Sequence, residues 1–313
     1  MNRIGFPKSR MKEEERIALV PEHITRFIKN PSYVYIETGY GERCGFTDKD
    51  YLERKVNVVS EREASSLEVI CLPKFCKDDL PRIQHNQTVF GWLHLERDAE
   101  DTQELIDKGV TAIPWEFLYK KGKYILKENR ELTGRLGVLH SIVYGGKKPS
   151  EYKAAVIGKG MVGSGAIKQL EELGAKVVVY DWNTMGIFKR NIELYDVIVH
   201  CADARKTILN KEHLSKMQRG ALFVHLGSDS IDGGFIAQSI YSPVVPINDG
   251  RNLAYRVNHV PTLAYKTLSR YISKQLSPYF NLLIKGEKDL TLENAIAIDG
   301  GRPIFERLWT PEI

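Results

Sequence analysis

The sequence predicts an α/β protein whose sheets are mainly parallel and divided between two domains. Short apolar strands alternate with helical segments through the first third of the chain and again over residues 153–250, which is the pattern of βαβ units. A glycine-rich turn directly follows an apolar strand near the middle of the chain. A helical pattern over residues 132–144, followed by a break containing Gly and Pro, indicates a connection between the two regions.

In the first region, each expected strand is a short apolar run that ends at a Pro, Gly or polar residue. Pro21 suits the first turn of a helix, and Thr47 is the expected N-cap of another. The expected strands are residues 4–6, 33–38, 69–72, 87–92 and 110–115, with a further helix at 102–108.

In the second region, the expected strands are residues 154–157, 177–180, 197–200, 222–226 and 244–247. A long helical pattern from about 264 to 280 is expected to return the chain to the first region, which the C-terminal segment completes. The predicted domains are therefore residues 1–135 with 275–313, and residues 136–274.

Composition excludes several classes of protein. The chain has 313 residues, of which 42% are hydrophobic and 27% charged, as in ordinary globular proteins. No apolar run approaches the ~18 residues of a membrane helix, and the N-terminus lacks a signal-peptide pattern. Four cysteines without a CxxC pair argue against a disulfide scaffold or structural zinc, and favour a cytoplasmic protein. The net charge of +5 is spread along the chain, so we expect no nucleic-acid partner.

The run Gly158-Lys159-Gly160-Met161-Val162-Gly163 has the spacing of a dinucleotide-binding turn, and it lies between an apolar strand and a helical pattern. Gly158 allows the tight turn, Gly160 lets the backbone approach the pyrophosphate, and Gly163 lets helix and strand pack closely. The N-terminus of the following helix offers unpaired N–H groups to phosphate. We therefore expect Met161 and Val162 to contribute to the same site.

Asp181 ends the second strand of this unit, where a carboxylate can accept hydrogen bonds from the adenosine ribose. A carboxylate there repels a 2′-phosphate, which favours NAD(H). Lys189 and Arg190 follow a few residues later and could instead bind that phosphate. NADP(H) therefore stays open as the cofactor.

Polar residues follow many of the expected strands, at the edge where ligands bind in open α/β sheets. Each alone is more often a cap or a solvated side chain, so their convergence is the stronger signal. They are Lys8, Lys74, His94 and Glu116 in the first domain, and Asp203, Ser228, Asp229, Asn248 and Asp249 in the second.

Among the eight histidines, His94 and His259 follow apolar segments at turns and are the best candidates for acid–base chemistry. His200 and His225 lie within apolar strands and are expected to be core residues. No two histidines have metal-ligand spacing, so no metal site is expected.

The chain resembles alanine dehydrogenases and the N-terminal domain of transhydrogenases at its start, in residues 3–8 and 15–21. It is more closely similar to the carboxyethyl-ornithine synthases, opine-type members of that superfamily. The segments that carry this similarity are residues 90–94, 112–116, 195–199, 216–221, 249–250 and 259–267.

The resemblance implies two Rossmann-like domains with a cleft between them, and an NAD(P)-dependent enzyme that reduces a keto acid joined to an amine. It implies that Arg16 holds the keto-acid carboxylate and that Lys74 and His94 polarise the substrate and transfer protons. The full set of expected site residues adds Glu116 at the substrate, and Ala202, Asp203, Gly227, Asp229 and His259 at the cofactor.

A keto acid and an amino acid are the implied substrates, and a homodimer or homotetramer is expected. The alternatives are an alanine dehydrogenase, in which ammonia is the amine, and a dinucleotide-binding protein without catalysis. A surface ion pair with a neighbouring glutamate is the structural alternative for Arg16.

Three positions depart from the synthases. Trp182 and Asn183 stand where the synthases have two arginines, which is unlike an NADP site. Asn258 replaces an Asp before His259. Residues 127–131 replace a Trp-Arg-Asn-Asn-Glu stretch, so the amine substrate can differ if that stretch lines its pocket.

Overall fold

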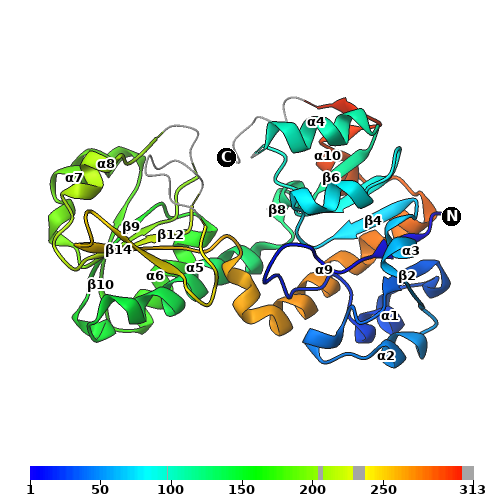
Figure 1. Ribbon diagram of the computed structural model, residues 1–313, viewed down its shortest axis with the longest axis horizontal. Helices are drawn as coiled ribbons and strands as arrows, with labels where there is room; N and C mark the ends of the chain where they lie inside the picture. Colours follow the sequence, from blue (N-terminus) through cyan, green and yellow to red (C-terminus); the bar gives the residue numbers. More distant parts are fainter. Residues whose placement is uncertain (97, 204–206, 228–236, 305–313) are drawn as a thin grey trace. The chain divides into compact units, whose positions relative to one another are not determined.

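The computed structural model describes residues 1–96, 98–203, 207–227 and 237–304 (Figure 1). The chain divides into two compact units. Unit 1 contains Met1–Leu126 and the described part of Ala264–Thr310, and unit 2 contains the described part of Lys127–Leu263. Each unit is built on its own mainly parallel sheet flanked by helices. The expected fold class, an α/β protein with two Rossmann-like units, is confirmed.

The sheet of unit 1 has the strand order β16-β15-β6-β5-β4-β1-β2-β3. The six strands from β6 to β3 are parallel, and β15 and β16 add an antiparallel edge. Their bounds are β1 (Ile4–Phe6), β2 (Val34–Glu37), β3 (Asn57–Val59), β4 (Val69–Leu72), β5 (Thr88–Gly91), β6 (Thr111–Pro114), β15 (Ile298–Asp299) and β16 (Arg302–Pro303). A small separate hairpin pairs β7 (Tyr119–Lys120) with β8 (Lys123–Tyr124).

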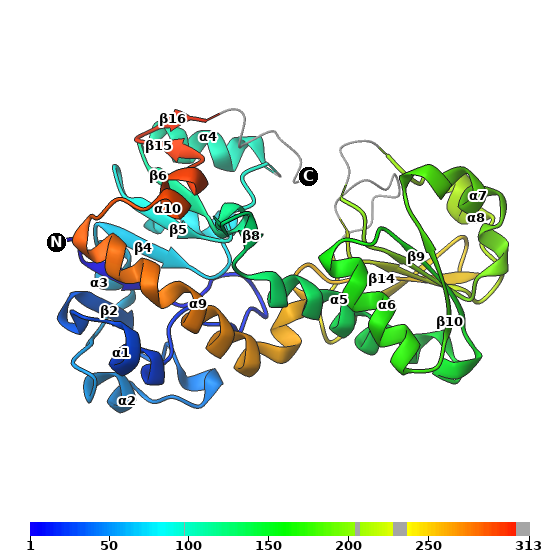
Figure 2. The same ribbon diagram turned by 180° about the vertical axis from the view of Figure 1, so that it is seen from behind.

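Helices cover both faces of this sheet, and alternate residues of a strand point to opposite faces. Neighbouring residues of β1 therefore contact different helices. A Cβ at Gly5 would lie 1.8 Å from the Ala64 carbonyl oxygen, so only glycine lets α3 (Glu61–Ser65) approach β1 so closely. Phe6 points to the other face, where its ring lies 5.0 Å from Phe280 of α9. Figure 2 shows α9 (Tyr265–Lys285) running along the sheet. The remaining helices are α1 (Pro21–Phe27), α2 (Asp48–Leu52), α4 (Ala99–Asp107) and α10 (Leu290–Ala295).

The sheet of unit 2 has the order β10-β9-β11-β12-β14-β13, and only β13 is antiparallel to its neighbour. Its strands are β9 (Lys153–Ile157), β10 (Lys176–Tyr180), β11 (Val197–His200), β12 (Leu222–His225), β13 (Val244–Ile247) and β14 (Asn252–Arg256). Helices α5 (Lys127–Ile142) and α6 (Met161–Glu172) supply the core on one face. Helices α7 (Met185–Arg190) and α8 (Lys211–Ser215) supply it on the other.

The unit boundaries lie earlier in the chain than the sequence suggested, because all of α5 packs in unit 2. A Cβ at Gly134 would lie 1.9 Å from the Val162 carbonyl oxygen, and a Cβ at Gly165 would lie 2.0 Å from that of Glu131. These two glycines let α5 and α6 lie with their backbones in contact along their lengths. The division therefore falls before Lys127, and a second division falls before Ala264, the N-cap of α9.

One strand of unit 2, β14, was not expected, and the strand before it, β13, runs antiparallel to it. β14 pairs in parallel with β12, whereas β13 runs antiparallel to β14. Asn248 and Asp249 therefore lie in the β13–β14 turn, with φ of 53° and 56°, and not at the carboxyl edge of the parallel strands. Their assignment to the ligand edge was wrong, because a short apolar run does not reveal its direction in a sheet.

Among the described helices, none is long and apolar enough to cross a membrane.

Candidate active site

Unit 1 brings three expected site residues to the ends of three neighbouring strands. β4, β5 and β6 are adjacent and parallel, so their carboxyl ends lie at the same edge of the sheet. Lys74 follows β4, His94 follows β5, and Glu116 follows β6 in a short 3₁₀ turn. The convergence of these three positions on one edge is thus present in the structure, and their chemical roles remain to be tested.

Glu116 and His94 contact each other directly. The Oε1 of Glu116 accepts a hydrogen bond from the backbone N–H of His94 at 2.7 Å, and it lies 3.2 Å from Nδ1 of the imidazole. His94 has φ of 47°, a left-handed conformation that costs a non-glycine residue free energy. The hydrogen bond that His94 N–H donates to Glu116 helps to hold this conformation, so the carboxylate fixes both the backbone and the ring of His94.

The Glu116 carboxyl group is buried among charges of both signs. Burial and the negative charge of Glu96 raise the pKa of Glu116 to about 7, while the positive charge of Lys74 opposes that rise. Lys74 itself is 8% exposed. Glu96 lies 3.6 Å from His94 Nδ1 and is much more exposed than Glu116. Two carboxyl groups of different burial therefore face one imidazole, and a buried lysine lies near one of them.

Arg16 forms a buried ion pair, and its partner is Glu14. The guanidinium Nε and Nη2 donate to the two carboxylate oxygens of Glu14 at 2.7 and 2.5 Å. The side chains of both residues are at most 3% exposed. The guanidinium carbon also lies 4.6 Å from the centre of the Trp92 ring, which is a cation–π geometry. The alternative predicted an ion pair at the surface, and this was wrong because the pair is buried. The sequence does not show which of Glu13, Glu14 and Glu15 turns inward.

The chain on the C-terminal side of Arg16 is anchored to α9 and its surroundings. The Ile17 N–H donates to Ser269 Oγ at 2.9 Å, and the Val20 N–H donates to Ser273 Oγ at 3.0 Å. The Ala18 N–H donates to the Tyr40 hydroxyl at 2.8 Å. These bonds satisfy buried backbone groups outside the sheet, so the position of Arg16 is set by packing as well as by Glu14.

In unit 2, the glycines of the fingerprint loop have the geometry that a bound dinucleotide requires. Gly158 has φ of 90°, which makes the tight turn possible. A Cβ at Gly163 would lie 1.9 Å from the Gly158 carbonyl oxygen, so this glycine permits the close contact of helix and strand. A Cβ at Gly160 would meet nothing within 4 Å, so the surface beside this residue is open. Gly160 is also the N-cap of α6 and provides no side chain to cap it.

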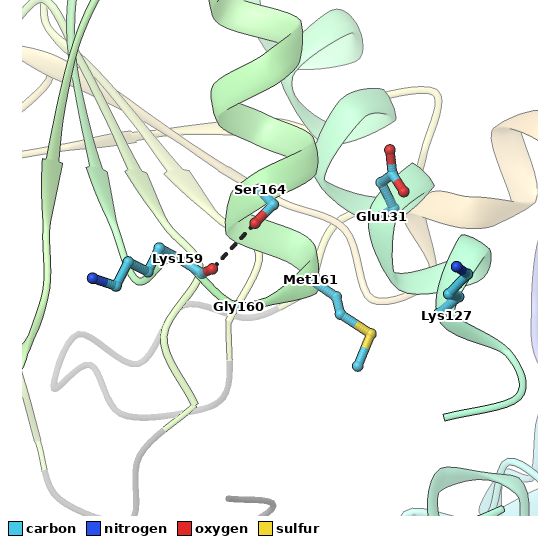
Figure 3. A pocket seen from close by; sticks show the side chains of 6 residues that line it. All are labelled: Lys127, Glu131, Lys159, Gly160, Met161 and Ser164. Atoms are coloured by element: carbon cyan, nitrogen blue, oxygen red, sulfur yellow. Dashed lines mark hydrogen bonds between the residues drawn. The ribbon is translucent and has the colours of Figure 1, made fainter. Parts of the chain in front are cut away.

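A pocket of about 360 Å³ lies at this loop. Figure 3 shows Met161 beside the start of α6, with Lys127 and Glu131 of α5 across from it and Lys159 extending to the other side. Gly160 and Ser164 complete the lining, and the Ser164 hydroxyl donates to the Lys159 carbonyl oxygen at 3.1 Å. Phosphate binds well at a helix N-terminus whose N–H groups are not capped. The loop therefore fits the pyrophosphate of a dinucleotide, and two residues of the 127–131 stretch lie beside it.

Asp181 stands directly after β10 and is partly exposed. Its Oδ1 accepts from the Asn183 N–H at 3.1 Å, and its Oδ2 lies 3.4 Å from Lys159 Nζ. A hydrogen bond from Thr184 and the nearby ammonium of Lys159 hold the pKa of Asp181 below its ordinary value. The acid is therefore ionised at neutral pH. Among the described residues, the cation beside Asp181 is Lys159 of the fingerprint loop. Lys189 of α7 lies near His213 instead, where burial and the charge of Lys189 both lower the pKa of that histidine.

The other expected cofactor residues lie at the same edge of the unit 2 sheet or outside the described residues. Ala202 and Asp203 follow β11, and Gly227 follows β12. A Cβ at Gly227 would lie 2.3 Å from the Ala202 carbonyl oxygen, so these two segments are in close contact. His259 is buried and follows β14, which is parallel to β12. Ser228 and Asp229 lie outside the described residues.

His200 and His225 are buried on neighbouring strands, with ring centres 5.2 Å apart. Burial lowers the pKa of His200 to about 3, so its imidazole is neutral. Among the described residues, no group of three or more His, Cys, Asp or Glu side chains could hold a metal ion.

Sequence reasoning missed Glu14 and Lys159 as members of these two sites. A buried partner for Arg16 could have been sought among the three consecutive glutamates before it. A lysine inside the fingerprint was visible, but only the pairing of β9 with β10 places it next to Asp181.

Comparison with known proteins first defines the class. Residues 5–126 match the family described as "Alanine dehydrogenase/PNT, N-terminal domain". An L-alanine dehydrogenase structure superposes with a TM-score of 0.79 at 21% identity, covering 98% of this chain and 99% of that one. A transhydrogenase structure from Sinorhizobium meliloti gives a TM-score of 0.75 at 17% identity, covering 95% and 97%. The fold is thus that of alanine dehydrogenase and transhydrogenase.

The particular relatives are enzymes by their names. The chain is 27% identical to the N(5)-(carboxyethyl)ornithine synthase of Lactococcus lactis, over 88% of this chain and 94% of the relative. It is 24% identical to an alanine dehydrogenase of Methanococcus maripaludis, over 95% and 91%. The resemblance inferred from the sequence is confirmed.

Proposed function

We propose that the protein is an NAD(P)-dependent oxidoreductase that reductively joins an α-keto acid such as pyruvate to the amino group of an amino acid such as ornithine or lysine, or cleaves the product in reverse. The observation that carries this proposal is the edge of unit 1 where Lys74, His94 and Glu116 follow three adjacent parallel strands. Unit 2 adds the dinucleotide fingerprint, and the similarity to the Lactococcus synthase extends over both units.

The reaction has two parts, and both require proton transfer. The neutral amine attacks the keto carbon, a proton moves to the departing hydroxyl as water leaves, and an imine forms. Protonation of the imine nitrogen and addition of a hydride to the imine carbon then give a secondary amine. A reduced nicotinamide dinucleotide, when bound, would supply that hydride and become oxidised.

Residues of unit 1 would bind the keto acid and move these protons. The buried ammonium of Lys74 would polarise the keto oxygen, and His94 would give a proton to the hydroxyl that leaves. Glu116 would orient His94 through Oε1, which faces both the backbone and the ring of that histidine. Its Oε2 is buried without a hydrogen-bond partner among the described residues, so this oxygen would contact the substrate.

Arg16 would hold the keto-acid carboxylate, with Glu14 and Trp92 fixing the plane of its guanidinium. Nε and Nη2 both donate to Glu14, so a substrate carboxylate would share this guanidinium with Glu14 or would displace Glu14. The first route costs less free energy, because a displaced Glu14 would be a buried charge separated from its partner.

In unit 2, the α6 N-terminus with Gly160, Met161 and Val162 would bind the pyrophosphate. Asp181 would accept hydrogen bonds from the adenosine ribose, which favours NADH over NADPH. Ala202, Asp203, Gly227 and His259 would lie along the rest of the dinucleotide. Lys159, next to Asp181, is the cation best placed to accommodate a 2′-phosphate.

A second candidate function is alanine dehydrogenase, in which ammonia is the amine. The superposition on an L-alanine dehydrogenase over 98% of the chain favours it. The protein is incubated with pyruvate, with NADH or NADPH, and with ornithine, lysine or an ammonium salt. Mass spectrometry of the products then distinguishes the two functions. We expect a secondary amine that appears only when the amino acid is present. We also propose that the enzyme is cytoplasmic and forms a homo-oligomer.

A further inference from the structure

Trp182 presents a large aromatic surface to solvent immediately after Asp181. Its side chain is 69% exposed, whereas Trp92 and Trp115 are 5% and 0% exposed. Tryptophan is usually among the more buried residues of a folded protein. Its exposed ring therefore calls for a ligand or partner that covers it.

The backbone that carries Trp182 is fixed by hydrogen bonds. Trp182 is the first residue of a 3₁₀ turn, Trp182–Thr184, whose N-cap is Asp181. The Asn183 N–H donates to Asp181 Oδ1 at 3.1 Å, and the Asp181 N–H donates to Thr184 Oγ1 at 2.8 Å. The turn thus ties the position of the Trp182 backbone to the carboxylate of Asp181.

The same carboxylate is tied to the fingerprint loop. Asp181 Oδ2 lies 3.4 Å from Lys159 Nζ, and the strands that lead into the two segments, β9 and β10, are paired in parallel up to Ile157 and Tyr180. In the proposed site, Asp181 binds the adenosine ribose. Because adenine is joined to that ribose by one bond, the base must lie beside the residues that flank Asp181.

We propose that Trp182 is the platform on which the adenine ring of the dinucleotide stacks. The inference rests on the proposed dinucleotide site and adds to it a residue that recognises the base. An aromatic ring offers a purine a flat, apolar and polarisable surface, and stacking on such a ring is a common source of affinity for nucleotides. The backbone of Trp182 is already fixed beside the ribose acid, so only its side chain has to be ordered when the base binds.

The test uses ADP-ribose, which contains the adenosine half and the pyrophosphate but lacks the nicotinamide ring. Binding is measured by calorimetry and by quenching of tryptophan emission, for the wild-type protein, Trp182→Ala and Trp182→Phe. Ile187→Ala is the matched control, because Ile187 is an exposed apolar residue on the neighbouring helix α7. Trp182 is exposed, so these substitutions should leave the melting temperature unchanged.

We expect ADP-ribose to quench the wild-type protein and to bind Trp182→Ala on the order of tenfold more weakly. Trp182→Phe should keep most of the affinity and lose the quenching, and Ile187→Ala should match the wild-type protein in both. Nicotinamide mononucleotide, which lacks adenine, should bind all four proteins equally. An affinity of Trp182→Ala for ADP-ribose within twofold of wild type would overturn the proposal, as would quenching that persists in Trp182→Phe.

Three further outcomes separate this inference from its alternatives. If Trp182→Ala changes the oligomeric state in size-exclusion chromatography but not the affinity for ADP-ribose, the ring belongs to a protein interface and the proposal is wrong. If ADP-ribose binding depends on Trp182 but no keto acid is reduced, the platform stands and the proposed reaction fails. If the wild-type protein does not bind ADP-ribose, both are wrong.

Discussion

Glu116 contacts His94 at two points: its Oε1 accepts a hydrogen bond from the His94 backbone N–H at 2.7 Å and lies 3.2 Å from Nδ1 of the ring. The histidine is held with φ of 47° at the end of β5, while the carboxylate comes from the end of β6. The two residues are 22 positions apart in the chain, and the parallel pairing of their strands brings them together. If His94 transfers a proton in the reaction, its orientation depends on this contact.

Replacing Glu116 by Gln should reduce kcat for keto-acid reduction by roughly tenfold, less than the roughly 10²-fold that loss of a proton-transfer group costs. The amide keeps an oxygen for the His94 N–H but loses the charge beside the ring. The pH profile of kcat should lose an inflection near the pKa of Glu116, which is about 7. Glu96→Gln is the comparison: it should keep the inflection but move it to lower pH, because the negative charge of Glu96 raises the pKa of Glu116. An unchanged profile in Glu116→Gln would show that Glu116 is not coupled to the proton transfer.

Glu116 should also make folding stability depend on pH. Its pKa is raised in the folded state from 4.5 to about 7, so ionisation is harder in the folded than in the unfolded protein. The free energy of unfolding relative to Glu116→Gln should therefore fall as pH rises from about 4.5 to 7, by up to about 3 kcal/mol. Urea denaturation of both proteins at pH 5 and pH 8 measures this difference. A difference that is the same at both pH values would contradict the raised pKa.

Breaking the Arg16–Glu14 pair should cost far more stability than breaking an exposed pair. Glu14→Gln leaves a buried guanidinium without its carboxylate, which we expect to lower the free energy of unfolding by roughly 3 kcal/mol. Glu68→Gln breaks the exposed pair with Arg3 and should cost less than ~1 kcal/mol. Equal effects of the two substitutions in urea denaturation would argue against the buried geometry.

The same pair should control the affinity for the keto acid. Arg16→Lys keeps the charge but cannot donate in a fork to Glu14, so KM for pyruvate should rise while the affinity for NADH stays constant. Glu14→Gln should raise KM in the same direction, because Glu14 orients the guanidinium. A lower KM in Glu14→Gln would instead show that Glu14 competes with the substrate, and an unchanged KM in Arg16→Lys would leave Arg16 a purely structural role.

Cofactor preference should follow the charges beside Asp181. We expect tighter binding of NADH than of NADPH, because the ionised Asp181 repels a 2′-phosphate. Lys159→Gln should widen that preference by weakening NADPH binding, and Lys189→Gln, on α7, should not. Fluorescence titration of both cofactors against the three proteins decides this. Tighter binding of NADPH than of NADH by the wild-type protein would contradict the preference. Weaker NADPH binding by Lys189→Gln would show that α7 binds the 2′-phosphate.

Much of the fold could be predicted from the sequence because its signals are local. The strand that precedes the fingerprint, the three glycines and Asp181 all lie where their spacing suggested, since each depends on a short stretch of chain. The partner of Arg16 depends instead on which of three consecutive glutamates turns inward, which packing against α9 and Trp92 decides. The direction of β13 depends on its pairing with β14, and no local pattern of residues reports strand pairing.

The candidate site was predicted better as a set of positions than as a set of contacts. Lys74, His94 and Glu116 were found because polar residues after parallel strands meet at one edge of a sheet. That Glu116 faces His94 itself, and not only a substrate, follows from the turns after β5 and β6. The Lys159–Asp181 contact likewise required the register of β9 against β10.

The residues expected to transfer protons can be tested individually. Lys74→Met and His94→Ala should each reduce turnover by on the order of 10²-fold or more while the affinity for NADH stays unchanged. The melting temperature serves as the control for the folding of unit 1, and cofactor titration shows that the fingerprint in unit 2 still binds. Turnover within a few-fold of wild type in either variant would remove that residue from the mechanism.

The most direct test of the proposed reaction is the mass of its product. The purified protein is incubated with pyruvate and NADH or NADPH, with and without ornithine or lysine, and the mixture is analysed by mass spectrometry. We predict a secondary amine whose mass equals the amino acid plus pyruvate, less one oxygen, formed in step with oxidation of the cofactor and only when the amino acid is present. Alanine formed from ammonium, with no product that depends on the amino acid, would contradict this account and identify an alanine dehydrogenase instead.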